Sequence, residues 1–162
     1  MPPMNHAPVN SIFDTEFTER LCEMFERQIC FNQVLGLQIE SLTADAASAR
    51  LQMRPELIGH FTHQRLHGGV ISATLDAMGG LAVMAAIGAR HLDESAEARL
   101  QRFGKLGTID LRIDYLRPGN GPAFRATAQV LRLGSRVAST RMEFFDAEGR
   151  LISCGAGAYI VS

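Results

Sequence analysis

The sequence predicts an α+β fold in which an antiparallel sheet wraps around one long buried helix. The first observation is that residues 66–89 are almost free of charge: Asp76 is the one formal charge between Arg65 and Arg90. A helix that is apolar on all sides belongs in the core of a protein or in a membrane. Two strand-like segments precede this stretch and four follow it. Runs of strands around a single apolar helix are typical of an antiparallel α+β domain.

The central segment is better explained as a core helix than as a membrane span. Its length alone would suit a bilayer. However, it contains five glycines and a central carboxylate, and no second segment of this kind occurs in the chain. Small residues let a sheet pack closely around a helix, so we expect 66–89 to be enclosed by the strands.

The N-terminal part is expected to form a disordered arm over residues 1–12 and an amphipathic helix over 13–31. Two roles are open for this helix: a lid over a substrate channel, or a cover for an edge of the sheet. The helix is predicted from apolar side chains at helical spacing, which are Phe17, Leu21, Met24, Phe25 and Ile29.

The strands are predicted from apolar side chains that alternate with polar ones. A change of phase at Leu131 indicates a β-bulge, and the charged residues 90–105 are expected to form a surface excursion. No repeat or linker divides the chain, so 13–162 is expected to be a single domain. The predicted strands are 37–42, 48–53, 108–115, 124–133, 138–144 and 151–161.

Composition excludes several classes of function. The net charge is −1 and tryptophan is absent, so neither a general nucleic-acid surface nor a base-stacking platform is expected. Three widely spaced cysteines form no disulfide or zinc pattern, and the first ten residues lack the features of a signal peptide. We therefore expect a cytoplasmic protein without stable membrane insertion. His91 has no neighbours at metal-ligand spacing, so no metal site is predicted.

A His67-Gly68-Gly69 segment precedes the central helix. Glycine lets a ligand approach the backbone, and the first N–H groups of a helix have no partners inside it. Such groups can hold the negative charge that develops during acyl transfer. Asp76 lies nine residues after His67, where a carboxylate is unfavourable unless it is partnered or functional. The alternative is that the glycines serve packing and Asp76 is a hydrogen-bonded core residue.

Two segments of the chain resemble the hot-dog-fold acyl-CoA thioesterases of the phenylacetate-degradation type. One runs from His67 to Ala82, and the other, TIDLRIDYLRPG, from Thr108 to Gly119. The resemblance covers roughly residues 35–162, and the two motifs in this order are more specific than either alone. It implies a hot-dog fold for the domain and hydrolysis of acyl-CoA thioesters as its activity.

The resemblance also implies roles for individual residues. Asp76 matches the acidic residue of the central helix, which acts in this family as nucleophile or general base. The N–H of Gly68, directly after the motif histidine His67, matches the donor that polarises the thioester carbonyl. Thr108 matches the hydroxyl residue that helps to position water.

The loop before His67 departs from the family pattern. Family members commonly have an Asn or Gln there, whereas this chain has His60 at the corresponding place, with His63 and Gln64 as alternatives. This departure leaves room for a non-catalytic acyl-CoA-binding protein. A hot-dog hydratase or dehydratase is a further alternative, in which His67 would be the catalytic histidine.

The expected ligand and assembly also follow from the resemblance. It implies acyl-CoA as the substrate, with no metal or redox cofactor. It implies a homodimer, or a dimer of dimers, in which two sheets join and each site draws residues from both subunits. The apolar wall from Val70 to Ile87 favours a medium to long acyl chain. The candidate contacts to CoA are Gly69, Arg117, Arg132 and Arg136. The alternative explanation of the three arginines is that they lie at solvated ends of strands.

Overall fold

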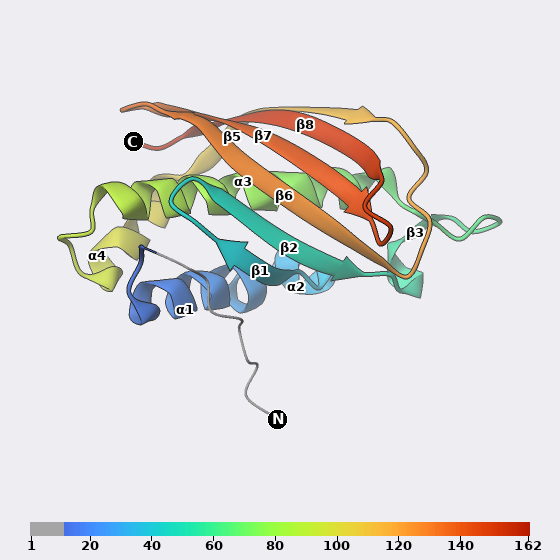
Figure 1. Cartoon of the computed structure of the whole chain (residues 1–162), viewed down its shortest axis with the longest axis horizontal. Helices are drawn as coiled ribbons and strands as arrows, with labels where there is room; N and C mark the ends of the chain where they lie inside the picture. The colour runs from blue at the N-terminus through green and yellow to red at the C-terminus, as the bar shows by residue number, and fades with distance from the viewer. Residues whose placement is uncertain (1–11) are drawn as a thin grey trace, which may run out of the picture.

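The computed structural model describes residues 12–162, so the arm predicted for 1–12 lies outside the described residues except for Ile12. Six antiparallel strands form one sheet in the order β1-β2-β6-β7-β8-β5. The sheet curves over one long helix, as Figure 1 shows, and this is the predicted hot-dog fold. The strands are β1 (Gln38–Leu42), β2 (Ala46–Gln52), β5 (Gly107–Tyr115), β6 (Ala123–Leu133), β7 (Val137–Asp146) and β8 (Leu151–Ile160).

The central helix α3 (Gly68–Arg90) is the predicted core helix. It is long and apolar enough to cross a membrane by length and composition, yet 72% of its most apolar window is buried inside the structure. Leu81, Val83 and Met84 have no exposed surface at all. The helix therefore forms the centre of the hydrophobic core, between the sheet and the N-terminal helices (Figure 1).

The bulge predicted at Leu131 is confirmed. The pairing of β6 with β7 shifts between Val130 and Arg132, so the residue between them has no partner on β7. A small hairpin of β3 (Ile58–His60) and β4 (Arg65–Leu66), introduced by a 3-10 turn over Pro55–Leu57, was not predicted. It leads directly into the N-terminus of α3.

The single helix predicted for 13–31 is wrong in its second half. Helix α1 (Thr15–Glu23) continues into a π-helical turn, η1 (Met24–Gln28), and the chain becomes extended at Ile29 before α2 (Cys30–Leu35). The carbonyl oxygen of Phe25 accepts a hydrogen bond from the Asn32 side chain at 2.9 Å. This side-chain donor compensates for the break in the backbone ladder, and the sequence has no glycine or proline there to indicate it.

The structure supports the second of the two roles considered for the N-terminal helix, a cover for an edge of the sheet. Glu26 accepts a hydrogen bond from the N–H of Ile39 at 2.6 Å, so η1 covers the free edge at β1. The ring of Phe17 packs where a side chain at Gly88 of α3 would lie, 2.4 Å from the ideal Cβ position. The segment thus covers α3 as well as the edge of the sheet.

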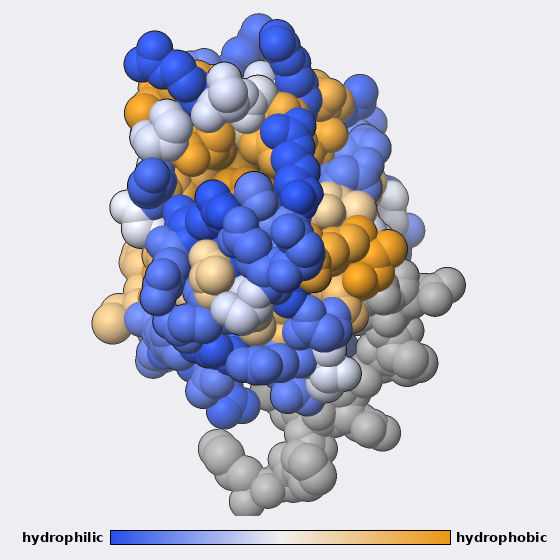
Figure 2. All heavy atoms as spheres, turned by 90° about the vertical axis from the view of Figure 1, so that its left-hand side faces the viewer, coloured by the Kyte–Doolittle hydropathy of each residue, from blue (hydrophilic) through white to orange (hydrophobic). Residues whose placement is uncertain are grey.

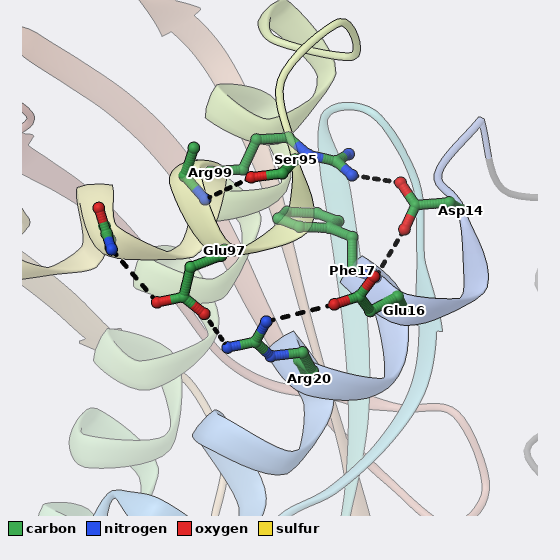
Figure 3. A network of polar contacts seen from close by, with 9 residues as sticks. Asp14, Glu16, Phe17, Arg20, Ser95, Glu97 and Arg99 are labelled. Atoms are coloured by element: carbon green, nitrogen blue, oxygen red, sulfur yellow. Dashed lines mark hydrogen bonds and ion pairs between the residues drawn. The ribbon is translucent and has the colours of Figure 1, made fainter.

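The excursion at 90–105 contains helix α4 (Ala96–Gln101) and a 3-10 turn, η3 (Arg102–Lys105). Helix α4 lies against α1 at the end of the molecule shown in Figure 2, where hydrophilic side chains surround a hydrophobic hollow. Two ion pairs join the helices, Arg99 with Asp14 and Arg20 with Glu97 (Figure 3). The excursion therefore anchors the N-terminal segment.

Candidate functional site

The carboxylate of Asp76 projects from the middle of α3 towards strands β5 and β8. The hydroxyl of Thr108 donates a hydrogen bond to Asp76 Oδ1 at 2.8 Å. The hydroxyl of Tyr159 lies 3.3 Å from the same oxygen and 3.1 Å from the backbone carbonyl oxygen of Asp76. Within residues 12–162 no group donates a hydrogen bond to Oδ2. One carboxylate oxygen is thus held by the protein, and the other is free for chemistry.

Asp76 lies in the wall of a pocket of about 270 Å³ whose other walls are mostly apolar. The π-helical turn contributes Phe25, and the η3 region contributes Phe103 and Leu106. A Cβ atom on Gly80, one turn after Asp76, would lie 3.6 Å from the nearest side-chain atom, in Leu106, so a methyl group would fit there in ordinary van der Waals contact. A carboxylate at the side of an apolar pocket is suited to act on the polar end of an apolar substrate.

The N-terminus of α3 forms a second polar centre. His67 precedes the helix, and its Nδ1 accepts a hydrogen bond from the N–H of Gly69 at 2.8 Å. No described residue accepts a hydrogen bond from the N–H of Gly68, whereas its carbonyl accepts one from the Tyr115 hydroxyl at 3.0 Å. Of the two glycines, Gly68 therefore presents the free donor at the positive end of the helix dipole.

The small hairpin fixes His67 in this position. The N–H of His67 donates to the carbonyl of Leu57 at 2.9 Å. A side chain at Gly59 would meet the Cα atom of His67 at 2.6 Å, so only glycine permits this close approach. The 3-10 turn and the hairpin thus hold the capping histidine at the start of α3.

A pocket of about 530 Å³ surrounds Gly68 and brings together several predicted residues. His60, His67 and Arg117 all line it. His63 and Gln64, the alternatives to His60, line a different pocket. Of these three residues, His60 is the one that lines the pocket around Gly68.

Arg117 is partly engaged within the chain, and Arg136 and His91 lie away from this pocket. Arg117 donates to the carbonyl of Leu151 at 2.7 Å, so part of its guanidinium is engaged within the chain. Arg136 is exposed at the turn between β6 and β7 and lines neither pocket. His91 lies 3.1 Å from Glu94, and the described residues contain no group of three metal-ligating side chains.

Within one chain the two polar centres are far apart. Gly68 and Asp76 are eight residues apart on α3, which corresponds to about 12 Å along the helix axis. They line different pockets, with Thr108 beside Asp76 and His60 beside Gly68. One copy of the chain therefore does not bring the carboxylate and the free N–H to the same reacting atom.

Two tyrosines next to the predicted residues were missed. Tyr159 contacts Asp76, and Tyr115 contacts Gly68. Both lie in strands, where an aromatic residue in an alternating pattern is indistinguishable from a packing residue. The one sequence feature that could have drawn attention to them is that the whole chain contains just these two tyrosines.

The chain is similar to several known proteins. A family model described as the thioesterase superfamily matches residues 63–153. The medium/long-chain acyl-CoA thioesterase YigI of Escherichia coli strain K12 is 38% identical over 139 residues, which are 86% of this chain and 90% of that protein. A solved structure from Shewanella oneidensis, related to the thioesterase superfamily, is 42% identical with a TM-score of 0.85, over 91% of this chain and 96% of that one. The match includes the start of α3, Asp76 and Thr108, and the chain belongs to the thioesterase superfamily.

Proposed function

We propose that this protein hydrolyses medium- to long-chain acyl-CoA to a free fatty acid and CoA, in the cytoplasm and without a metal or redox cofactor. The observation that carries the proposal is the Asp76 carboxylate, held through one oxygen beside an apolar pocket. The similarity to YigI, whose name states this activity, supports the same substrate class.

In the proposed reaction Asp76 acts as general base or as nucleophile. As a base, Oδ2 takes a proton from a water molecule, and the water oxygen bonds to the thioester carbon. The carbonyl oxygen becomes an oxyanion that accepts a hydrogen bond from the N–H of Gly68. The intermediate then expels the CoA thiolate, a good leaving group because a thiol has a pKa of about 8.5. The proton on Asp76 passes to the thiolate sulfur, which restores the carboxylate. Thr108 steadies the carboxylate or the water.

A site formed by two copies of the chain would bring together Gly68 and Asp76, which are far apart within one copy. We infer that two copies join their sheets through β5, the edge strand that contains Thr108. This strand exposes Ile109 and Tyr115, which are 57% and 54% accessible. The edge of a sheet presents unpaired backbone groups, which are a ready template for pairing with another strand. The Gly68 centre of one copy then meets the Asp76 pocket of the other.

The decisive test replaces Asp76. Asp76→Asn keeps the shape of the side chain, so a folded oligomer is expected, with hydrolysis lowered by about two to four orders of magnitude. Release of free thiol from acyl-CoA measures the rate, and binding of the acyl-CoA by calorimetry provides the control. An inactive wild-type protein that binds acyl-CoA would favour the non-catalytic alternative. Normal turnover in Asp76→Asn would refute the role of Asp76.

The shared site is tested by mixing two inactive variants. Asp76→Ala removes the carboxylate, and Gly68→Pro removes the backbone N–H of the other centre. If sites are shared, a refolded mixture regains part of the activity through hybrid dimers, whereas each variant alone stays inactive. Folded hybrids without activity would contradict the shared site.

Chain length is tested with a series of substrates from acetyl-CoA to palmitoyl-CoA, together with phenylacetyl-CoA and hydroxybenzoyl-CoA. Each buried methylene contributes about 0.8 kcal/mol, so kcat/KM should rise with length until the pocket is full. A maximum at acetyl-CoA or at an aromatic thioester would refute the assignment of the acyl group.

A further inference from the structure

Tyr159 has a buried hydroxyl group, and packing of the side chain alone does not explain why a hydroxyl is there. Its side chain is 1% exposed, at the end of β8. Burial is the main cause that raises the pKa of Tyr159 far above its ordinary value, and the negative charge of Asp76 adds to it. A phenylalanine would fill the same space without a polar group to satisfy.

Two glycines leave the space that the Tyr159 side chain occupies. An ideal Cβ atom on Gly79 would lie 2.1 Å from the Tyr159 hydroxyl oxygen, and one on Gly157 would lie 2.9 Å from its ring. Any larger residue at Gly79 would push the hydroxyl away from α3. The ring can therefore reach the helix backbone beside Asp76.

Thr108 and Tyr159 form a pair across two strands. They are direct partners in the antiparallel register of β5 and β8. Side chains of directly opposed residues lie on the same face of a sheet. The Thr108 hydroxyl lies 2.8 Å from Oδ1 of Asp76, and the Tyr159 hydroxyl lies 3.3 Å from Oδ1 and 3.1 Å from the backbone carbonyl oxygen of the same residue. Two hydroxyls from adjacent strands thus converge on one carboxylate oxygen, while Oδ2 remains free.

We propose that Tyr159 is a positioning residue, which together with Thr108 fixes Oδ1 of Asp76 so that Oδ2 faces the thioester. The inference rests on the proposed function, since it assigns no reaction to Tyr159 itself. The hydrogen bond from Thr108 and the one that Tyr159 shares between Oδ1 and the Asp76 carbonyl oxygen both oppose rotation of the carboxylate. Asp76 and Tyr159 are the only ionisable side chains among the described residues that line this pocket.

The test is Tyr159→Phe, which removes only the hydroxyl. We expect kcat to fall about tenfold with KM within about twofold, because a hydrogen bond to a charged group is worth more than one between neutral groups. The acid limb of the kcat/KM profile should move to higher pH, because the charged carboxylate has lost a donor. Gly79→Ala keeps the hydroxyl but displaces it, so it should shift the acid limb in the same direction.

The matched control is Thr74→Val. Thr74 is fully buried on the same helix, and its hydroxyl has no hydrogen-bond partner among the described residues. This variant should leave kcat and the pH profile unchanged. If Tyr159→Phe behaves like Thr74→Val while Asp76→Asn is inactive, the inference about Tyr159 is wrong and the proposed function stands. If Asp76→Asn is active, both are wrong. A lower kcat in Tyr159→Phe with an unmoved acid limb would show a structural role only and overturn the inference.

Discussion

At the ion pair between Asp14 and Arg99, the contribution of the α1 cap to stability can be separated from that of pairing the buried Arg99 charge (Figure 3). Asp14 caps α1, with Oδ1 accepting a hydrogen bond from the N–H of Phe17 at 2.8 Å, and its Oδ2 contacts Arg99. The Arg99 side chain is only 2% exposed, with its guanidinium carbon 4.2 Å from the centre of the Phe17 ring. Its Nε and Nη1 atoms are buried without a hydrogen-bond partner in the described structure.

The expected losses of stability follow from these contacts. Asp14→Ala removes the cap, which is worth about 1 kcal/mol, and leaves the Arg99 charge buried and unpaired. Breaking a buried pair costs about 3–5 kcal/mol, and we take the lower end because Asp14 is half exposed. Asp14→Ala should therefore cost about 4 kcal/mol. Asp14→Asn keeps a cap and should cost about 3 kcal/mol.

Arg99→Met should behave differently from either Asp14 variant. It gives up the contact with the Phe17 ring, worth about 0.5–2 kcal/mol, but it also removes the buried charge and two unpaired donors. We expect a change within about 1 kcal/mol of the wild type, because apolar replacements of buried ion pairs are often neutral. In the Arg99→Met background, Asp14→Ala should cost only the cap, about 1 kcal/mol.

Urea unfolding at one fixed protein concentration measures all four variants. The Phe17 N–H first, and then Arg99, lower the pKa of Asp14 in the folded protein. A lowered pKa stabilises the fold above the unfolded value of about 4, and this stabilisation is lost as the pH falls through the lowered folded value. The gap between the wild type and Asp14→Asn should therefore narrow below about pH 4. An Arg99→Met variant as unstable as Asp14→Ala would refute the reasoning.

Three further substitutions are expected to have distinct effects. Gly80→Leu should shift the preferred acyl chain to shorter lengths, because a Cβ atom fits at this position but the rest of the leucine side chain would fill the pocket. The substrate series measures this shift, and an unchanged optimum would contradict the location of the acyl site. Gly88→Ala should cost about 1–3 kcal/mol in urea unfolding, because the new methyl group would overlap the Phe17 ring. Thr74→Val should raise stability by about 1 kcal/mol by removing an unpaired buried hydroxyl, and a loss of stability would reveal a partner for it.

The central part of the fold could be predicted because its signals are local and strong. Residues 66–89 are apolar on all sides, which requires burial, and a lone Asp76 in that setting requires a partner or a function. Strand alternation also located the bulge near Leu131, since a change of phase is visible in the sequence itself. The pairing of Asp76 with Thr108 came from the family resemblance and is present in the structure.

Other features depend on tertiary contacts that leave no local signal. The break at Ile29 is compensated by the Asn32 side chain, which pairs with a carbonyl seven residues earlier. The role of Tyr159 depends on the register between β5 and β8 and on the space at Gly79. Neither is encoded by periodicity, so an amphipathic helix and an ordinary strand were the natural predictions.

The position of α3 in the chain has a consequence for synthesis of the protein. Four of the six strands, β5 to β8, come after α3 in the sequence. At about 5–20 residues per second, a ribosome needs about 4–14 s to make the segment from Arg90 to Ile160. During that time the nascent chain carries a helix that is long and apolar enough, by length and composition, to cross a membrane, while four strands of its sheet are still being made. A carboxylate near the middle of such a helix, as Asp76 is, raises the free energy of insertion into a bilayer by about 2.5–3.5 kcal/mol and so disfavours insertion.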